Sequence, residues 1–139
     1  MNEASRPLIR ALAMNAIFSA TSAVLMLLSA DWVAAQVGLP GPADVYSVSV
    51  FLLVFAGWLG FIVYTVRIRM PEILLIIAGD LVWVLGSAVL VGLHYNGFTT
   101  AGLFLTDAVA LAVLTFAVLQ IRGLRRYRKG ARLSPAATA

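Results

Sequence analysis

The chain has 139 residues, of which 62% are hydrophobic and 12% are charged. Soluble domains average about 45–50% apolar and about 25% charged residues, so this composition is typical of a membrane protein. The chain has no cysteine, which excludes disulfides, thiol catalysis and cysteine-ligated metal or iron–sulfur sites. His94 is the only histidine, so one chain cannot supply a bis-histidine haem or a multi-histidine metal site. We therefore expect no metal and no cofactor.

Four long apolar runs follow one another along the chain, at residues 9–30, 45–66, 73–93 and 100–121. Each run has about 21 residues, or roughly 32 Å as a helix, which is enough to cross a hydrocarbon core of about 30 Å. Inside a bilayer every backbone polar group needs an internal partner, so helix is the expected form. The sequence predicts an all-α membrane protein, an antiparallel bundle of four transmembrane helices formed by residues 1–121.

Turn-forming residues separate the four runs. They are Gly38, Pro40, Gly41 and Pro42 in the first linker, Pro71 in the second, and Asn96 and Gly97 in the third. Glycine and proline clusters of this kind interrupt helices, and Asn-Gly is a turn dipeptide. The third linker is short, so the last two helices are predicted to be antiparallel neighbours.

All ten basic residues fall on one side of this four-span topology. Arg6 and Arg10 precede the first run, Arg67 and Arg69 lie between the second and third, and six follow the fourth. By the positive-inside rule, both termini are predicted to be cytoplasmic. A cleaved signal peptide is an alternative interpretation of the first run, with residues 33–35 as the cleavage site. Its apolar core is however about 20 residues long, where signal peptides have about 7–15.

Residues 122–139 are predicted to form a basic cytoplasmic tail. Its six cationic residues are Arg122, Arg125, Arg126, Arg128, Lys129 and Arg132. Clusters of this kind next to a membrane span bind anionic lipid headgroups at about 1 kcal/mol per charge. The tail contains one aromatic residue, Tyr127, and no recognisable nucleic-acid-binding module, so we expect membrane lipids and no nucleic acid as partners.

A single carboxylate interrupts the third run, at Asp80 in "GDLVWVLGS". An ionised aspartate near mid-span costs about 2.5–3.5 kcal/mol, so this side chain should face the protein interior, protonated or partnered. Asn15 lies at a similar depth in the first run and could donate to it. Two polar stripes at helical spacing would meet there: Asn15, Ser19 and Ser22 on the first helix, and Asp80, Trp83 and Ser87 on the third. This candidate site is either structural packing or a proton-linked or ligand-binding site.

Two further polar residues lie in the fourth run. Asp107 is near the outer end of this run, where Tyr46, Ser47 and Ser49 of the second run lie at a comparable depth and could contact it. Gln120 is near the inner end, where we expect it to be solvated or to cap the helix. Small residues on three helices are predicted to allow close helix contacts within a monomer or in a homodimer: Gly57, Gly60, Gly79, Gly86, Ala108 and Ala112.

The segments "NAIFSATSAVLMLL", "GDLVWVLGSAVLV" and "VLQIRGLRR" resemble a group of small bacterial four-span membrane proteins of uncharacterised function. The resemblance covers most of the chain and implies a bacterial inner membrane. Small multidrug-resistance transporters also have four short spans, but they carry a glutamate in the first helix, where this chain has only Asn15. DoxX-like four-helix proteins are similar in size and topology, without a matching motif here.

Three hypotheses for function follow. The favoured one is a non-enzymatic accessory or scaffold bundle that contacts a membrane partner or lipid. The alternative is a proton-coupled small-solute transporter or ligand-binding protein, with Asp80 as the proton carrier and Asn15, Trp83 and Asp107 along the path. Four helices of this length enclose little volume, so such a path would lie at a homodimer interface. An intramembrane enzyme lacks a plausible set of catalytic residues.

Overall fold

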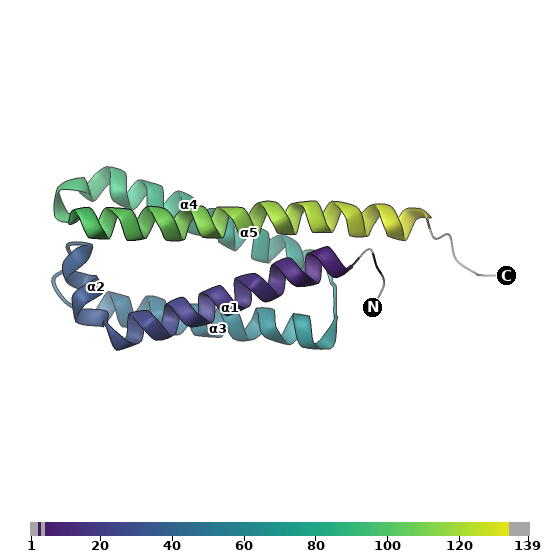
Figure 1. Ribbon diagram of the computed structural model, residues 1–139, viewed down its shortest axis with the longest axis horizontal. Coiled ribbons are helices and arrows are strands. Elements are labelled where there is room, and N and C mark those ends of the chain that lie inside the picture. Colours follow the sequence, from purple (N-terminus) through teal and green to yellow (C-terminus); the bar gives the residue numbers. More distant parts are fainter. Residues whose placement is uncertain (1–2, 4, 134–139) are drawn as a thin grey trace.

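The computed structural model describes residue 3 and residues 5–133, with side chains described as far as Gly130. The described residues form five α-helices and one short 3-10 helix, with no strand among them (Figure 1). In chain order these are α1 (Arg6–Leu28), α2 (Ala30–Gln36), α3 (Ala43–Thr65), α4 (Met70–His94), η1 (Tyr95–Gly97) and α5 (Thr100–Leu133). The predicted all-α class is confirmed.

Four of these helices, α1, α3, α4 and α5, are long and apolar enough to cross a membrane. They correspond to the four apolar runs, so the chain is a helical membrane protein. The start of α1 and the end of α5 lie at the same end of the molecule, which we call the termini end (Figure 1). The short helix α2 and η1 lie at the opposite end, which we call the α2 end.

The predicted turn residues of the first linker lie in a non-helical stretch, residues 37–42, and an additional short helix, α2, precedes them. The main helix α1 stops at Leu28, and the next residue, Ser29, donates its hydroxyl to the Leu25 carbonyl at 2.6 Å. A serine that bonds the carbonyl of the preceding turn bends a helix, and here the chain turns into α2. Ala30 and Ala34 of α2 then pack against Val45 of α3.

The first part of the basic segment is helical. Residues 122–133 continue α5 without a break, so the last turns of this helix extend beyond the start of α1 (Figure 1). The six cationic residues of this segment therefore lie on a helix. Residues 134–139 of the predicted tail lie outside the described residues.

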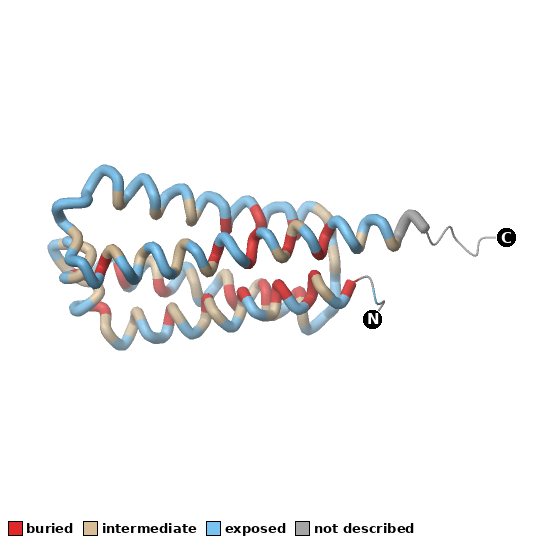
Figure 2. Tube along the Cα trace, turned by 45° about the horizontal axis from the view of Figure 1, so that its top comes forward, coloured by how far each residue is buried: buried red, intermediate tan, exposed pale blue. Residues whose placement is uncertain are grey.

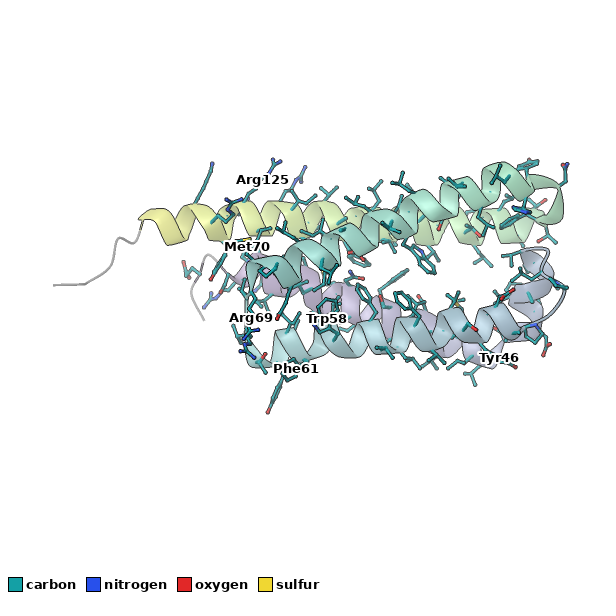
Figure 3. The ribbon with its side chains drawn as sticks, turned by 180° about the vertical axis from the view of Figure 1, so that it is seen from behind. Tyr46, Trp58, Phe61, Arg69, Met70 and Arg125 are labelled. Atoms are coloured by element: carbon teal, nitrogen blue, oxygen red, sulfur yellow. The ribbon has the colours of Figure 1, made fainter. Side chains whose placement is uncertain are left out.

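The main core lies at the termini end of the bundle. Helix α1 packs against α3 and α5, and α5 also packs against α4. Side chains from all four long helices meet in one apolar cluster, formed by Leu8, Leu12, Leu59, Ile62, Ile73, Ile76, Ile77 and Leu124. The half of α4 toward the α2 end is different, because no residue from 81 to 94 is buried (Figure 2). Figure 3 shows Trp58 on the side of α3 that faces α4, next to this core.

The predicted close contacts are not made at the four glycines or at Ala108. A Cβ atom added at Gly57, Gly60, Gly79 or Gly86 would have no atom of another segment within 4 Å, and Ala108 is exposed. Close backbone approaches are made instead at Gly38, Gly102 and Gly123, and at Gly123 an added Cβ would lie 2.8 Å from Leu8 Cα. Gly123 therefore sets the distance between α1 and α5.

We expect Gly123→Ala to lower the free energy of unfolding by about 1–3 kcal/mol, because the new methyl group would press against the α1 backbone. Gly57→Ala is the matched control: Gly57 lies mid-helix in open space, so alanine should be neutral or stabilising by up to about 1 kcal/mol. Unfolding in mixed detergent micelles, followed by circular dichroism, measures both. Equal effects of the two variants would contradict the close packing at Gly123.

Candidate functional site

Asp80 lies on the buried face of α4. The buried residues of this helix are Ile73, Ile76, Ile77 and Asp80. Their spacing places them on one face of the helix. Asp80 thus occupies the next position of an apolar stripe, and its exposed fraction is 3%. The same helix rotation that buries the three isoleucines therefore places the carboxylate inside the bundle.

The partner predicted for Asp80 is present on α1. Asn15 Nδ2 donates to Asp80 Oδ2 at 2.8 Å, and Asn15 is 1% exposed. Ser19, one turn further along α1, donates its hydroxyl to Asn15 Oδ1 at 3.2 Å. The Asn15–Asp80 contact predicted from the two polar stripes is confirmed as a contact between α1 and α4. Ser19 orients the amide so that its NH₂ group points at the carboxylate.

Gln120 of α5 is the residue that sequence analysis misplaced. It was predicted to be solvated or capping, but it is 0% exposed and donates from Nε2 to Asp80 Oδ2 at 3.0 Å. A periodic pattern identifies its position: Val113, Phe116, Ala117, Gln120 and Leu124 share one buried face of α5. The expectation was wrong because it used only the distance of Gln120 from the helix end and ignored this face.

These residues form a polar cluster of Asp80, Asn15, Gln120 and Ser19. One carboxylate oxygen accepts hydrogen bonds from amides on two other helices, so the cluster connects α1, α4 and α5. No Cα atom of α1 lies within 8 Å of one of α4 among the described residues, so these long side chains bridge the space between them. Gln120 Oε1 is buried without a hydrogen-bond partner in the described part of the chain.

The other members of the predicted α4 face do not join the cluster. Ser87 is half-buried and donates its hydroxyl to the backbone carbonyl of Trp83 at 2.9 Å. Trp83 is also half-buried, and its indole N–H makes no hydrogen bond with a described residue. Trp83 therefore shares a helix face with Asp80 without joining its hydrogen bonds.

The structure does not bring Asp107 together with the second span. Asp107 is exposed on α5, and no contact between α3 and α5 is present in the described part of the chain. Ser47 and Ser49 donate to the carbonyls of Ala43 and Val45 in their own helix, at 3.0 and 2.7 Å. The predicted Asp107 contact is therefore not made, because Asp107 is exposed and the two serine hydroxyls bond their own helix.

The cationic residues predicted to contact lipid headgroups follow the cluster along α5. Arg122, Arg125, Arg126, Arg128 and Lys129 are exposed. The side chain of Arg132 lies outside the described residues. Figure 3 shows Arg125 on the face of α5 that points away from the other helices. These side chains are thus available at the surface of the termini end.

We expect Asp80→Asn to change the free energy of unfolding by less than about 1 kcal/mol, and Asp80→Leu to lower it by about 1–3 kcal/mol. Asparagine retains a carbonyl oxygen for the two amide donors and adds an N–H donor. Leucine leaves Asn15 Nδ2 and Gln120 Nε2 buried without an acceptor. Unfolding of the two variants in detergent distinguishes these cases. If both variants matched the wild type, the cluster would contribute nothing to the fold.

A double-mutant cycle should detect the coupling between Asn15 and Asp80. For Asn15→Ala and Asp80→Ala, we expect a coupling free energy of about 0.6–1.7 kcal/mol, the range of interhelical hydrogen bonds in membranes. The control cycle pairs Asp80→Ala with Ser87→Ala, whose hydroxyl bonds only its own helix. This control should show no coupling. Additive effects in the first cycle would contradict the hydrogen bond between α1 and α4.

No protein-family model, curated protein or solved structure matches this chain. What the molecule does is therefore inferred from its own residues. Two features carry the inference: the polar cluster around Asp80 and the basic surface of the termini end.

Proposed function

We propose that the chain is a non-enzymatic accessory or scaffold bundle of a membrane, which works through its contacts with a protein partner or with lipid. The observation that carries this proposal is the bonding of Asp80. The chain's one deeply buried carboxylate among the described residues already holds two amide donors from neighbouring helices. Asp80 thus links three helices inside the bundle. The outer surfaces of the helices remain available for contacts with a partner or with lipid.

The hydroxyl groups of the spans support the same conclusion. Most of them donate to the carbonyl four residues earlier in their own helix, as Ser29, Ser47, Ser49, Thr65, Ser87 and Thr115 do. Such groups are satisfied by their own backbone and need no ligand. Ser19 is also occupied, because it donates to Asn15.

Catalysis is not supported by the placement of the reactive residue types. The chain has no cysteine, and its one histidine, His94, is exposed at the far end of α4. Asp80 is roughly 21 Å from His94 along the helix, by a rise of about 1.5 Å per residue. No acid–base pair can form across this distance.

The proposed setting is a bacterial inner membrane, crossed by an antiparallel bundle with both termini in the cytoplasm. The support is the charge distribution, because every lysine and arginine lies in the first two turns of α1, after the apolar part of α5, or in the short connection between α3 and α4. Basic residues of this placement are retained on the cytoplasmic side.

A second candidate function is proton-coupled transport through Asp80, and one observation favours it. Gln120 Oε1 is a buried acceptor that no described residue donates to, and it belongs to the amide that already bonds Asp80. A proton arriving on the carboxyl group would bring a new donor into this cluster. Carboxyl groups inside spans serve proton relays in pumps and transporters.

A flux measurement separates the two candidates. The purified chain is reconstituted in vesicles that contain a pH-sensitive dye, and a pH gradient with a neutralising potassium potential is applied. We expect proton entry at the rate of protein-free vesicles, and the same rate for Asp80→Asn. Flux above this rate that Asp80→Asn abolishes would replace the accessory proposal by the transport one.

A further inference from the structure

A cavity of about 600 Å³ opens between the first turns of α1 and the last turns of α5, at the termini end. Four arginines line it: Arg6 and Arg10 from α1, and Arg122 and Arg126 from α5. Each pair is spaced four residues apart, so the two side chains of a pair lie on one face of their helix. Gly123 brings the two faces together by its close approach to Leu8.

The charge of this cavity is poorly balanced by the protein. Its described lining contains four arginines and one acidic residue, Glu3, so its formal charge is +3. The carboxylate of Glu3 lies 3.5 Å from Arg6 with 89% of its side chain exposed, so this ion pair is weak. Arg10, Arg122 and Arg126 have no hydrogen bond or ion pair with any described residue.

The backbone adds to the positive potential. Helix α1 begins at this cavity, and its first turn contains no acidic side chain that would balance the partial positive charge of a helix start. Pro7, in the same turn, has no N–H group of its own, but the fixed dipole of a helix with 23 residues remains. Arginines and helix start together favour an anion in this cavity.

The shape of the cavity favours a lipid over a free anion. Met14 and Leu119 complete its lining on the side nearer the middle of the spans, while the four arginines lie nearer the helix ends. Met14 is 53% exposed, so its apolar surface is accessible next to the charged part. A site with cationic groups at one end and apolar groups at the other matches a phosphate headgroup followed by an acyl chain.

We propose that this arginine cavity binds the phosphate of an anionic phospholipid, with the start of an acyl chain against Met14 and Leu119. Guanidinium groups bind phosphate through paired hydrogen bonds, and basic pockets between membrane helices hold anionic headgroups. The volume is within the range of about 300–1,000 Å³ for ligand sites. This inference rests on the lipid-contacting part of the proposed function and makes it specific to one pair of helices.

The test compares two variants that lose the same number of charges from the same region. The cavity variant is Arg10→Gln, Arg122→Gln, Arg126→Gln, and the control variant is Arg125→Gln, Arg128→Gln, Lys129→Gln, outside the lining. Native mass spectrometry in a non-ionic detergent measures binding of phosphatidylglycerol and, as the zwitterionic reference, phosphatidylcholine with the same chains. We expect the cavity variant to weaken phosphatidylglycerol binding about tenfold or more, and the control by less than about threefold.

A charge-conserving variant and a free anion complete the design. Arg10→Lys, Arg122→Lys, Arg126→Lys keeps the charge without the planar guanidinium, so its affinity should fall between the wild type and the glutamine variant. It also keeps the test decisive if the glutamine variant fails to fold by circular dichroism. Excess inorganic phosphate should not displace phosphatidylglycerol, because it makes no contact with Met14 and Leu119.

Three outcomes would overturn the inference. Equal losses in the cavity and control variants would mean a diffuse basic surface, which leaves the proposed lipid contact intact. Displacement of the lipid by inorganic phosphate would mean a free-anion site. Equal binding of phosphatidylglycerol and phosphatidylcholine by the wild type would remove the charge recognition, and with it the lipid-headgroup part of the proposed function.

Discussion

The hydrogen bonds to one oxygen of Asp80 organise this bundle. A carboxylate inside an apolar helix must find donors, because lipid offers none and an ionised aspartate near mid-span costs about 2.5–3.5 kcal/mol. Two amides supply them, Asn15 from α1 and Gln120 from α5. Since each amide must face Asp80, the rotation of three helices about their own axes is restricted at one level of the membrane.

This restriction agrees with the packing of the apolar residues around it. On α4 the isoleucine stripe and Asp80 share one face, and on α1 Leu8, Leu12 and Asn15 are all buried. Van der Waals packing and the polar bonds therefore favour the same arrangement. From residue 81 to residue 94, α4 carries no buried residue. Among the described residues, this half of α4 packs only against α5 and the α4–α5 connection. Most of the buried apolar side chains therefore lie at the termini end.

The sequence predicts the features that follow from hydropathy and from helical periodicity. The four spans follow from hydropathy and length, and the Asn15–Asp80 contact follows from two polar stripes at equal depth. Gln120 was misplaced because its distance from the helix end was used without the buried face of α5, and Asp107 because its partners depend on which helices are neighbours. In a membrane, lipid-facing and core-facing side chains are both apolar, so polarity alone does not fix the inward face of a helix. Asp107 is expected next to α3 residues, yet α5 packs against α1 and α4, and no Cα atom of α3 lies within 8 Å of one of α5 among the described residues.

The helix pair α1–α5 connects the two features from which function is inferred. Helix α1 contributes Asn15 to the polar cluster, and α5 contributes Gln120. The turns of both helices nearer the termini end carry the arginines of the cavity. Gly123 holds the pair together between them. The four arginines repel one another across this contact, so the close packing works against their charge. An anionic headgroup in the cavity would remove that repulsion, and a ligand that binds only the packed pair stabilises it by mass action. Lipid composition at the termini end would then act on the same helix contact that positions both amides around Asp80.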